Sequence, residues 1–255
     1  MSENDSPTTL DTTTVGMRLG RAETTDGTVS GKIVDGEIQT DDGNYSLDGD
    51  TTNLLPPCEP SALFCIGRNY AETIKQMNYD LPDEPTFFIK PPASIIGPEE
   101  PIPYPTFSDE VTYAGELAAV IGEECFEIAP EEVPKNVLGY TIMNDVDALD
   151  QANLPARKAF NGSGPLGPWI ETDVDPTAID MYTYINGEKR QNANTNMMIF
   201  DPFELVSYLS YRFTFQPGDV VAFGSPANPG LIEPGDEIEI TYEGIGTLRN
   251  SVTAP

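Results

Sequence analysis

The sequence predicts a mixed α/β fold that is rich in β-structure. Short apolar or alternating runs recur along the chain, and turn-forming residues separate them, which is the pattern of strands. The 255 residues include 24 Pro, which disfavours long helices, and few segments carry the signals of a helix start. The length suits one large domain, or one domain with a small additional lobe, with a core that needs no disulfides.

The chain is expected to have three parts. Residues 1–16 are polar and rich in Thr, Ser and Asp, and are predicted to be a disordered acidic tail. Residues 17–57 contain short strand-like segments between Asp-Gly turns, which predicts a small N-terminal β lobe. Several Pro residues then lead into the main body, residues 58–255.

The main body is expected to contain seven strands and two helices. The strands are predicted at residues 62–66, 87–90, 111–121, 137–143, 181–185, 220–223 and 238–242. A short helix is expected from about residue 70 to 77. The clearest helix begins after Asp201, because Asp201 is a good N-cap, Pro202 suits the first position and Glu204 completes a capping box.

The charge is strongly acidic, with 42 Asp and Glu against 13 Lys and Arg and a net charge of −29. An acidic partner-binding surface is one interpretation. Adaptation to a high-salt cytoplasm is the favoured one, because the acid is spread along the whole chain and salt screens its self-repulsion. Both disfavour binding to nucleic acid or to an anionic membrane surface, since these partners attract basic patches.

Residue types narrow the chemistry further. The three cysteines, Cys58, Cys65 and Cys125, have no metal-ligand spacing and indicate reduced thiols in a cytoplasmic protein. No apolar run approaches the length of a membrane span, and no signal peptide is evident. The chain contains no His, which excludes any mechanism that needs an imidazole.

Residues 61–250 carry a series of short motifs in a fixed order. They are Cys65-Ile66-Gly67-Arg68-Asn69-Tyr70, Phe88-Ile89-Lys90-Pro91-Pro92, Ser94-Ile95-Ile96-Gly97-Pro98, Gly115-Glu116-Leu117-Ala118, Asn144-Asp145-Val146, Pro165-Leu166-Gly167-Pro168-Trp169, Pro217-Gly218-Asp219-Val220 and Gly244-Ile245-Gly246-Thr247-Leu248-Arg249-Asn250. In this order the chain resembles the fumarylacetoacetate hydrolase family. The small front lobe is also similar to that family's N-terminal appendage.

The resemblance implies a β-roll fold and a homodimer. It implies substrates that are 2-oxo acids or related dicarbonyls, and a divalent metal, commonly Mg²⁺ or Mn²⁺, held by three carboxylates. In that family the metal chelates the 2-oxo acid and stabilises an enolate-like charge.

The metal positions implied by the resemblance are incomplete. The family places Glu at two alternating strand positions and Asp at the end of a later strand; these positions hold Ala114, Glu116 and Asp145. A weak or absent Mg²⁺ or Mn²⁺ site is therefore predicted, with Asp147 or Asp150 as conceivable replacements for the third ligand. The alternative is that Glu116 and Asp145 are buried carboxylates bonded to backbone amides or to Lys.

The general base is also absent. Many relatives carry His and Glu three residues apart on the short helix, where Thr73 and Gln76 stand here, and neither side chain accepts protons near neutral pH. The retained candidates are Lys158 and Ser225 as catalytic residues. The substrate-binding candidates are Arg68, Asn69, Lys90, Lys158 and Ser225. If Lys90 is buried, it is expected to neutralise Glu116.

Two functions remain open at this point, and whether the chain is an enzyme is left undecided. The first is a family enzyme of 2-oxo acid or dicarbonyl metabolism, of the hydrolase, decarboxylase, hydratase or isomerase type, with an altered metal site. The alternative is a non-catalytic family member that binds a small acid or a protein partner. An acidic interaction protein unrelated to small molecules ranks third.

Overall fold

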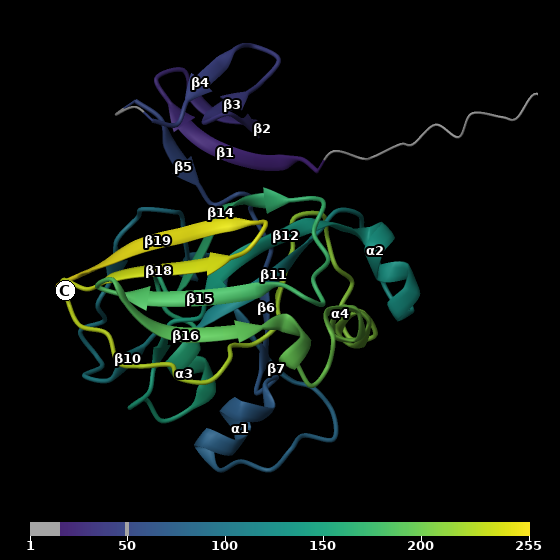
Figure 1. Ribbon diagram of the computed structural model, residues 1–255, viewed down its shortest axis with the longest axis vertical. Coiled ribbons are helices and arrows are strands. Elements are labelled where there is room, and N and C mark those ends of the chain that lie inside the picture. The colour runs from purple at the N-terminus through teal and green to yellow at the C-terminus, as the bar shows by residue number, and fades with distance from the viewer. Residues whose placement is uncertain (1–15, 49–50) are drawn as a thin grey trace, which may run out of the picture.

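The computed structural model describes residues 16–48 and 51–255. The predicted tail, residues 1–16, lies outside the described residues except for Gly16. The described chain forms a large twisted sheet, a second five-stranded sheet and a two-stranded ladder, with few and short helices (Figure 1). The predicted β-rich mixed α/β fold is confirmed.

Twelve strands form the large sheet. They are β1 (Arg18–Thr24), β2 (Gly27–Val34), β3 (Glu37–Gln39), β4 (Asn44–Ser46), β5 (Asn53–Leu55), β6 (Leu63–Gly67), β7 (Thr86–Lys90), β8 (Ile95–Ile96), β11 (Gly115–Ile121), β12 (Val137–Asn144), β14 (Gly164–Glu171) and β17 (Val220–Ala222). The five-stranded sheet contains β9 (Ile102–Pro103), β15 (Asp180–Ile185), β16 (Glu188–Asn194), β18 (Glu237–Tyr242) and β19 (Gly246–Thr253). The ladder pairs β10 (Val111–Thr112) with β13 (Asp147–Ala148).

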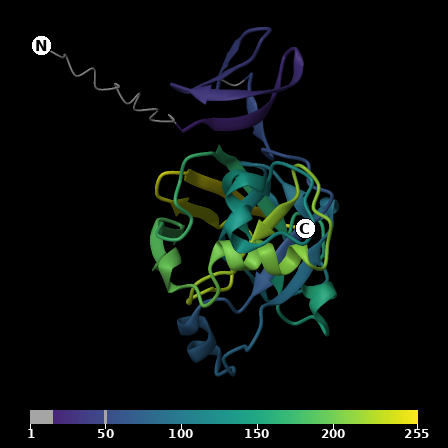
Figure 2. The same cartoon turned by 90° about the vertical axis from the view of Figure 1, so that its right-hand side faces the viewer.

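The helices lie outside the sheets. They are α1 (Ala71–Met77), α2 (Val133–Asn136), α3 (Leu154–Lys158) and α4 (Pro202–Ser210), with 3₁₀ turns at Pro92–Ser94, Pro130–Glu132 and Thr195–Met197. The predicted capping box of α4 is confirmed: Asp201 accepts from the amides of Phe203 and Glu204, and the Glu204 carboxylate accepts from the Asp201 amide at 2.9 Å. Figure 2 shows α1, in blue, at the opposite end of the molecule from the N-terminal strands.

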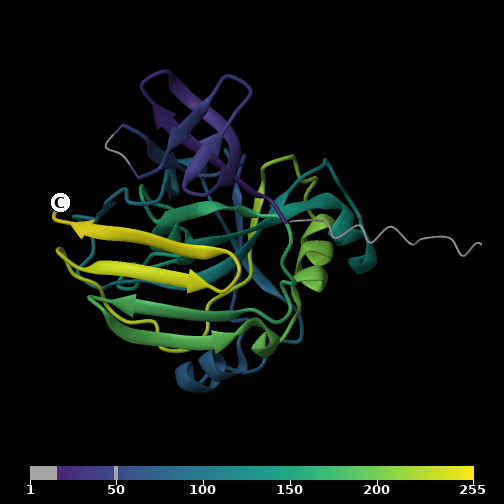
Figure 3. The same ribbon diagram turned by 45° about the horizontal axis from the view of Figure 1, so that its top comes forward.

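The N-terminal strands continue the large sheet at one edge. The path of hydrogen-bonded neighbours runs β4-β3-β2-β1-β14-β12-β11-β17-β6-β7. Strand β1 meets β14 only at Arg18 and Leu19, after which β1 leaves the body and pairs along its length with β2. In Figure 3 these purple strands project from the body at the top of the view. The division into residues 17–57 and 58–255 stays a prediction.

Strand β11 lies at the centre of the fold and is buried from end to end. Its alternating side chains enter two clusters, because successive residues of a strand point to opposite faces. Leu117 and Ala119 join the core against the five-stranded sheet, and Ala118 and Val120 join a smaller core on the other face. Burial on both faces explains the nearly continuous apolar run in this strand.

The segment 111–121, predicted as one strand, is two strands in the structure. Residues Tyr113 and Ala114 interrupt it, because β10 pairs with β13 whereas β11 pairs with β12. At the interruption, the Ala114 carbonyl accepts a hydrogen bond from the Asp145 amide at 2.9 Å. This break brings the start of β11 beside the end of β12.

The acidic surface leads to a prediction about stability. Most carboxylates have no ion-pair partner among the described residues, so repulsion between them is opposed mainly by salt. The screening length falls from about 10 Å at 0.1 M to about 3 Å at 1 M salt. We expect Tm to rise between 0.1 M and 3 M KCl, by about 2–4 °C for each kcal/mol gained. Thermal melts, with sucrose as the uncharged control, test this rise in Tm. A Tm that does not change with KCl concentration would refute the halophilic interpretation.

Candidate active site

The predicted site residues gather where several strands of the large sheet end. Strands β6 and β17 are parallel, and both end at the edge where antiparallel β11 begins and β12 ends. Consequently the turn at Arg68, the start of β11 at Glu116, the residue after β12, Asp145, and the loop that carries Ser225 share one edge. Helix α3 delivers Lys158 to the same place from its last residue.

Lys90 is fully buried and is held by backbone oxygens. Its ammonium group donates to the carbonyls of Val146, Lys158 and Ser163 at 3.0, 2.7 and 2.8 Å. These bonds use all three protons, so the Asp145 Oδ1 atom, 2.9 Å from Nζ, has a charge contact but no hydrogen bond. Burial lowers the pKa of the Lys90 ammonium, and the Asp145 charge opposes that shift. Lys90 was expected to neutralise Glu116; its ion pair is instead with Asp145, although its charge also slightly opposes the rise in the pKa of Glu116 that burial causes.

Lys158 completes the cluster from the other side of Asp145. Its ammonium donates a short hydrogen bond to Asp145 Oδ2 and lies 3.0 Å from Asp147 Oδ2. Asp147 is also bound by Arg157 through Nε at 2.9 Å and Nη2 at 2.6 Å. Burial alone would raise the pKa of Asp145, but the charges of Lys158 and Lys90 outweigh it and hold that pKa below its usual value.

Glu116 is the carboxyl of the site that no lysine or arginine pairs with among the described residues. It is 2% exposed, and its Oε2 atom accepts a hydrogen bond from the Gly224 amide at 3.0 Å. Burial raises the pKa of Glu116 to about 8; the nearby charge of Asp145 adds to the shift, and Lys158 opposes it. Glu116 and its donor therefore connect β11 to the loop that follows β17.

The residues present do not fit a three-carboxylate metal site. Ala114 contributes only a methyl group, Asp147 is engaged by Arg157 and Lys158, and Asp150 is bonded to Ser108 and the Asp109 amide. No three Asp, Glu, His or Cys side chains converge on a metal position within residues 16–48 and 51–255. The unbonded Asp145 Oδ1 offers a single oxygen, and it already faces the Lys90 ammonium.

The cluster instead has no excess of negative charge, because its carboxyl groups do not outnumber its cations and the raised pKa of about 8 keeps Glu116 mostly protonated at neutral pH. Three carboxyl groups face three cations in a protein whose net charge is −29. The carboxyl groups are those of Glu116, Asp145 and Asp147, and the cations are Lys90, Arg157 and Lys158. A divalent ion would add two positive charges to a buried group that is already balanced, which is costly in a poorly solvated position.

Helix α1 is attached to the Ser225 loop by Thr73 and Gln76, the two positions at which the resemblance predicted a base and its partner. Thr73 Oγ1 donates to the Ser225 carbonyl at 3.2 Å. Gln76 Nε2 donates to Asn228 Oδ1 at 3.2 Å, and Gln76 Oε1 accepts from the Asn228 amide at 3.0 Å. These positions thus hold the helix against the loop.

Arg68 and Asn69 occupy the turn after β6. Arg68 has a φ of 63°, and its guanidinium lies 3.9 Å from the centre of the Tyr79 ring. Asn69 is 1% exposed; its amide nitrogen donates to the carbonyls of Phe200 and Phe223, and its oxygen accepts from the Phe200 amide. Both side chains are engaged by the protein itself, and their substrate-binding role stays a prediction.

Two residues of this region escaped the sequence analysis. Gln191 is fully buried and binds both the start of β11 and the Ser225 loop. The buried Tyr70 hydroxyl has no hydrogen-bond partner among the described residues, and Glu116 influences it electrostatically. No signal in the sequence pointed to Gln191, because six of the seven residues in segment 188–194 are polar.

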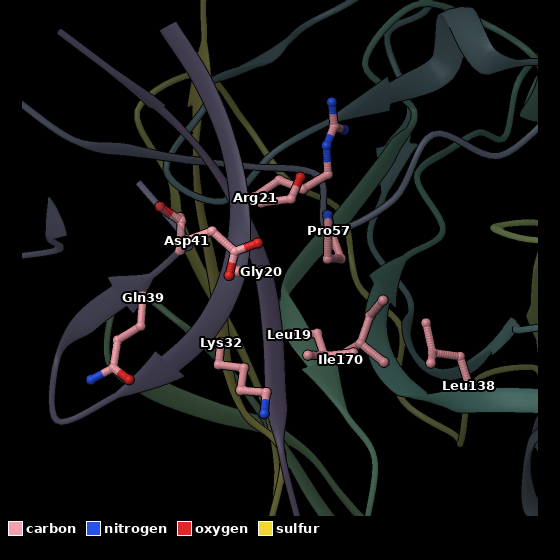
Figure 4. Close-up of a pocket in the computed structure, with 12 residues that line it drawn as sticks. Leu19, Gly20, Arg21, Lys32, Gln39, Asp41, Pro57, Leu138 and Ile170 are labelled. Carbon is pink, nitrogen blue, oxygen red and sulfur yellow. The ribbon is translucent and has the colours of Figure 1, made fainter. Parts of the chain in front are cut away.

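Two open cavities lie elsewhere, beside the N-terminal strands. The first, of about 600 Å³, is bounded by β1 to β3 and by Leu138 and Ile170 of the body (Figure 4). In Figure 4 the Lys32 side chain comes from β2, and Asp41 lies in the turn between β3 and β4. The second, of about 560 Å³, includes Arg21, whose guanidinium is paired with Glu59 at 2.5 Å. Neither cavity contains a residue of the candidate site.

The chain belongs to the fumarylacetoacetate hydrolase family. Residues 62–253 match the family model described as fumarylacetoacetate (FAA) hydrolase C-terminal. The fold matches 5-carboxymethyl-2-hydroxymuconate delta-isomerase from Mycobacterium smegmatis with a TM-score of 0.86 and 37% identity, over 94% of this chain and 99% of that chain. The family β-roll expected from the motifs is therefore confirmed.

Two further relatives show the range of the family. Human mitochondrial oxaloacetate tautomerase FAHD2A is 34% identical over 80% of this chain and 70% of its own length. Fumarylpyruvate hydrolase from Pseudomonas aeruginosa, solved in complex with Mn²⁺ and pyruvate, is 29% identical, covers 81% of this chain and 93% of that chain, and has a TM-score of 0.74. Isomerases, tautomerases and hydrolases are thus all similar to this chain. Within the described residues, no helix is long and apolar enough to cross a membrane.

Proposed function

We propose that this protein binds a small 2-oxo acid beside Lys158 and Ser225 and catalyses its keto–enol tautomerisation without a divalent metal. The observation that carries the proposal is the balanced cluster in which Lys90 and Lys158 flank Asp145. Ammonium groups fixed in a buried site stabilise negative charge that develops on a bound oxygen, as a metal ion does.

Tautomerisation requires only a few functional groups in the site. One proton leaves the carbon next to the 2-oxo group and one proton is added to the carbonyl oxygen, so no bond between heavy atoms breaks. The reaction needs a cation near the oxygen and one group that carries the proton. We assign the cation to Lys158 and the carrier to Glu116, because Glu116 is the carboxyl that no ion pair of the described residues engages.

Hydrolysis and decarboxylation fit the site less well. Hydrolysis needs a base that activates water, and Thr73 and Gln76 stand where relatives carry that base and its partner. Both side chains are bonded to the Ser225 loop instead. The 34% identical oxaloacetate tautomerase supports the simpler reaction.

A second candidate is a binder without catalysis. Lys158 already donates to Asp145 and faces Asp147, so its charge is largely neutralised by these two carboxylates. In that case the same face would recognise an acid without polarising its carbonyl. The homodimer, the cytoplasmic location and the weak or absent Mg²⁺ or Mn²⁺ site remain predictions, and nucleic acid and membranes remain the disfavoured partners.

Ultraviolet absorbance of the oxaloacetate enol separates the two candidates. We expect the wild-type protein to speed the conversion of enol to keto form equally with and without EDTA, and Glu116→Gln to abolish that rate while still binding pyruvate. A rate that EDTA removes would contradict the metal-free mechanism. Pyruvate binding without any acceleration would favour the non-catalytic binder.

A further inference from the structure

Gln191 lies on β16, and its side chain reaches both the start of β11 and the loop that carries Ser225. Its side chain is fully buried and takes part in five hydrogen bonds. The oxygen accepts from the Gly115 amide at 3.3 Å and from Thr183 Oγ1 at 2.9 Å. The nitrogen contacts Ser225 Oγ and the Pro226 carbonyl at 3.0 Å each, which use its two protons, and the longer contact to the Ala227 carbonyl at 3.3 Å shares one of them.

The neighbours fix which end of this amide faces the loop. The backbone N–H of Gly115 can only donate, so it requires the Gln191 oxygen. The carbonyls of Pro226 and Ala227 can only accept, so they require the Gln191 nitrogen. Rotating the amide by 180° would place oxygen against oxygen at both carbonyls. The orientation therefore follows from the network, and Gln191 acts as a donor to Ser225.

The direction of this bond decides what Ser225 can offer. Because Ser225 Oγ accepts from Gln191, the hydroxyl proton remains to be donated elsewhere. The acceptor within the protein is the Pro226 carbonyl at 3.4 Å, which is long for an O–H···O hydrogen bond. Ser225 is half-buried and lies at the strand edge where the ligand is proposed to bind.

The loop that carries Ser225 is also held from other sides. The Gly224 amide donates to Glu116, and the Ser225 carbonyl accepts from Thr73 on α1. Since Gln191 binds Gly115 as well, it links the hydroxyl of Ser225 to the strand that carries Glu116. The hydroxyl and the carboxyl are thus positioned by one buried amide.

We infer that Gln191 is a positioning residue that fixes the Ser225 hydroxyl as a hydrogen-bond donor toward an oxygen of the ligand. The ligand group is an acceptor such as a carboxylate or a 2-oxo group, and a ligand that offers only N–H donors at this point is disfavoured. The inference rests on the proposed function, because it names the contact that the 2-oxo acid makes with the loop.

Pyruvate binding by calorimetry tests the inference on the full chain. Ser225→Ala should weaken binding by about tenfold, the loss expected for one hydrogen bond to a charged acceptor, and Ser225→Thr should keep wild-type affinity. Gln191→Glu keeps the size of the side chain but turns the donor into an acceptor, which draws the Ser225 proton inward. It should weaken binding as much as Ser225→Ala, and the double variant should bind no more weakly than either single variant.

Different outcomes would contradict the proposed function and the role of Gln191. A wild-type protein that binds neither pyruvate nor oxaloacetate overturns the proposed function and this inference with it. Wild-type binding with unchanged affinity in Ser225→Ala overturns the inference alone, as do additive losses in the double variant. If Gln191→Glu does not fold, the comparison of Ser225→Ala with Ser225→Thr decides, and equal affinities for these two refute the inference.

Discussion

Replacing Lys158 by Met is expected to lower pyruvate affinity at least about a hundredfold and to cost about 3 kcal/mol of unfolding free energy. Met retains the length and apolar stem of Lys but removes its charge. Asp145 then keeps only Lys90, whose three protons are already donated to carbonyls. The stability loss falls at the low end for a broken buried pair, because Asp147 keeps Arg157.

The control for this variant is Lys189→Met. Lys189 is exposed and lies 4.2 Å from the Tyr182 ring, so the same chemical change on the surface should alter stability by about 0.5 kcal/mol or less. Urea unfolding and pyruvate calorimetry measure both effects. Lys158→Met with wild-type affinity would show that the ammonium does not contact the ligand, and the proposed site would then be wrong.

Replacing Ala114 by Glu is expected to create Mn²⁺ binding that the wild-type protein lacks. The Ala114 carbonyl accepts a hydrogen bond from the Asp145 amide. A Glu side chain at position 114 would therefore begin close to Asp145, and it would lie two residues from Glu116. Without metal, the added charge should destabilise the protein, since no cation remains to pair with it. With Mn²⁺ at a hundred times Kd, linkage should restore about 2.7 kcal/mol.

Ala114→Gln is the matched control, because it has nearly the same shape without the charge. Thermal melts with and without Mn²⁺ should separate the two variants, and equal responses would show that the carboxylate is not what the site lacks. Adding Thr73→His and Gln76→Glu to Ala114→Glu should return a base beside the metal. That triple variant also loses the contacts of α1 with Ser225 and Asn228, so α1 should be less well held.

Local features of the fold could be predicted because their causes lie close together in the sequence. The α4 capping box involves residues that are three apart, and the structure reproduces it. The interruption at Tyr113 and Ala114 could not be predicted, since it depends on which strands lie beside β10 and β11. A continuous apolar pattern does not reveal a change of partner.

The candidate site shows the same difference between local features, which the sequence predicts, and long-range contacts, which it does not. The resemblance to the family predicts a lost ligand at Ala114, because the family pattern of two alternating positions around Gly115 spans only three residues. The contact of Lys90 with Asp145 joins residues 55 positions apart, and the hydrogen bond of Gln76 to Asn228 spans 152 positions. The orientation of Gln191 depends on three separate segments that only the folded chain brings together.

Calorimetric titration of the wild-type protein with Mn²⁺ in molar KCl tests the central claim most directly. The balanced cluster of Glu116, Asp145 and Asp147 with Lys90, Arg157 and Lys158 leaves no charge for a divalent ion to neutralise. We expect no heat of specific binding up to millimolar Mn²⁺, while Ala114→Glu binds in the same buffer. Stoichiometric, micromolar binding of Mn²⁺ to the wild-type protein, lost in Glu116→Gln, would contradict the metal-free site.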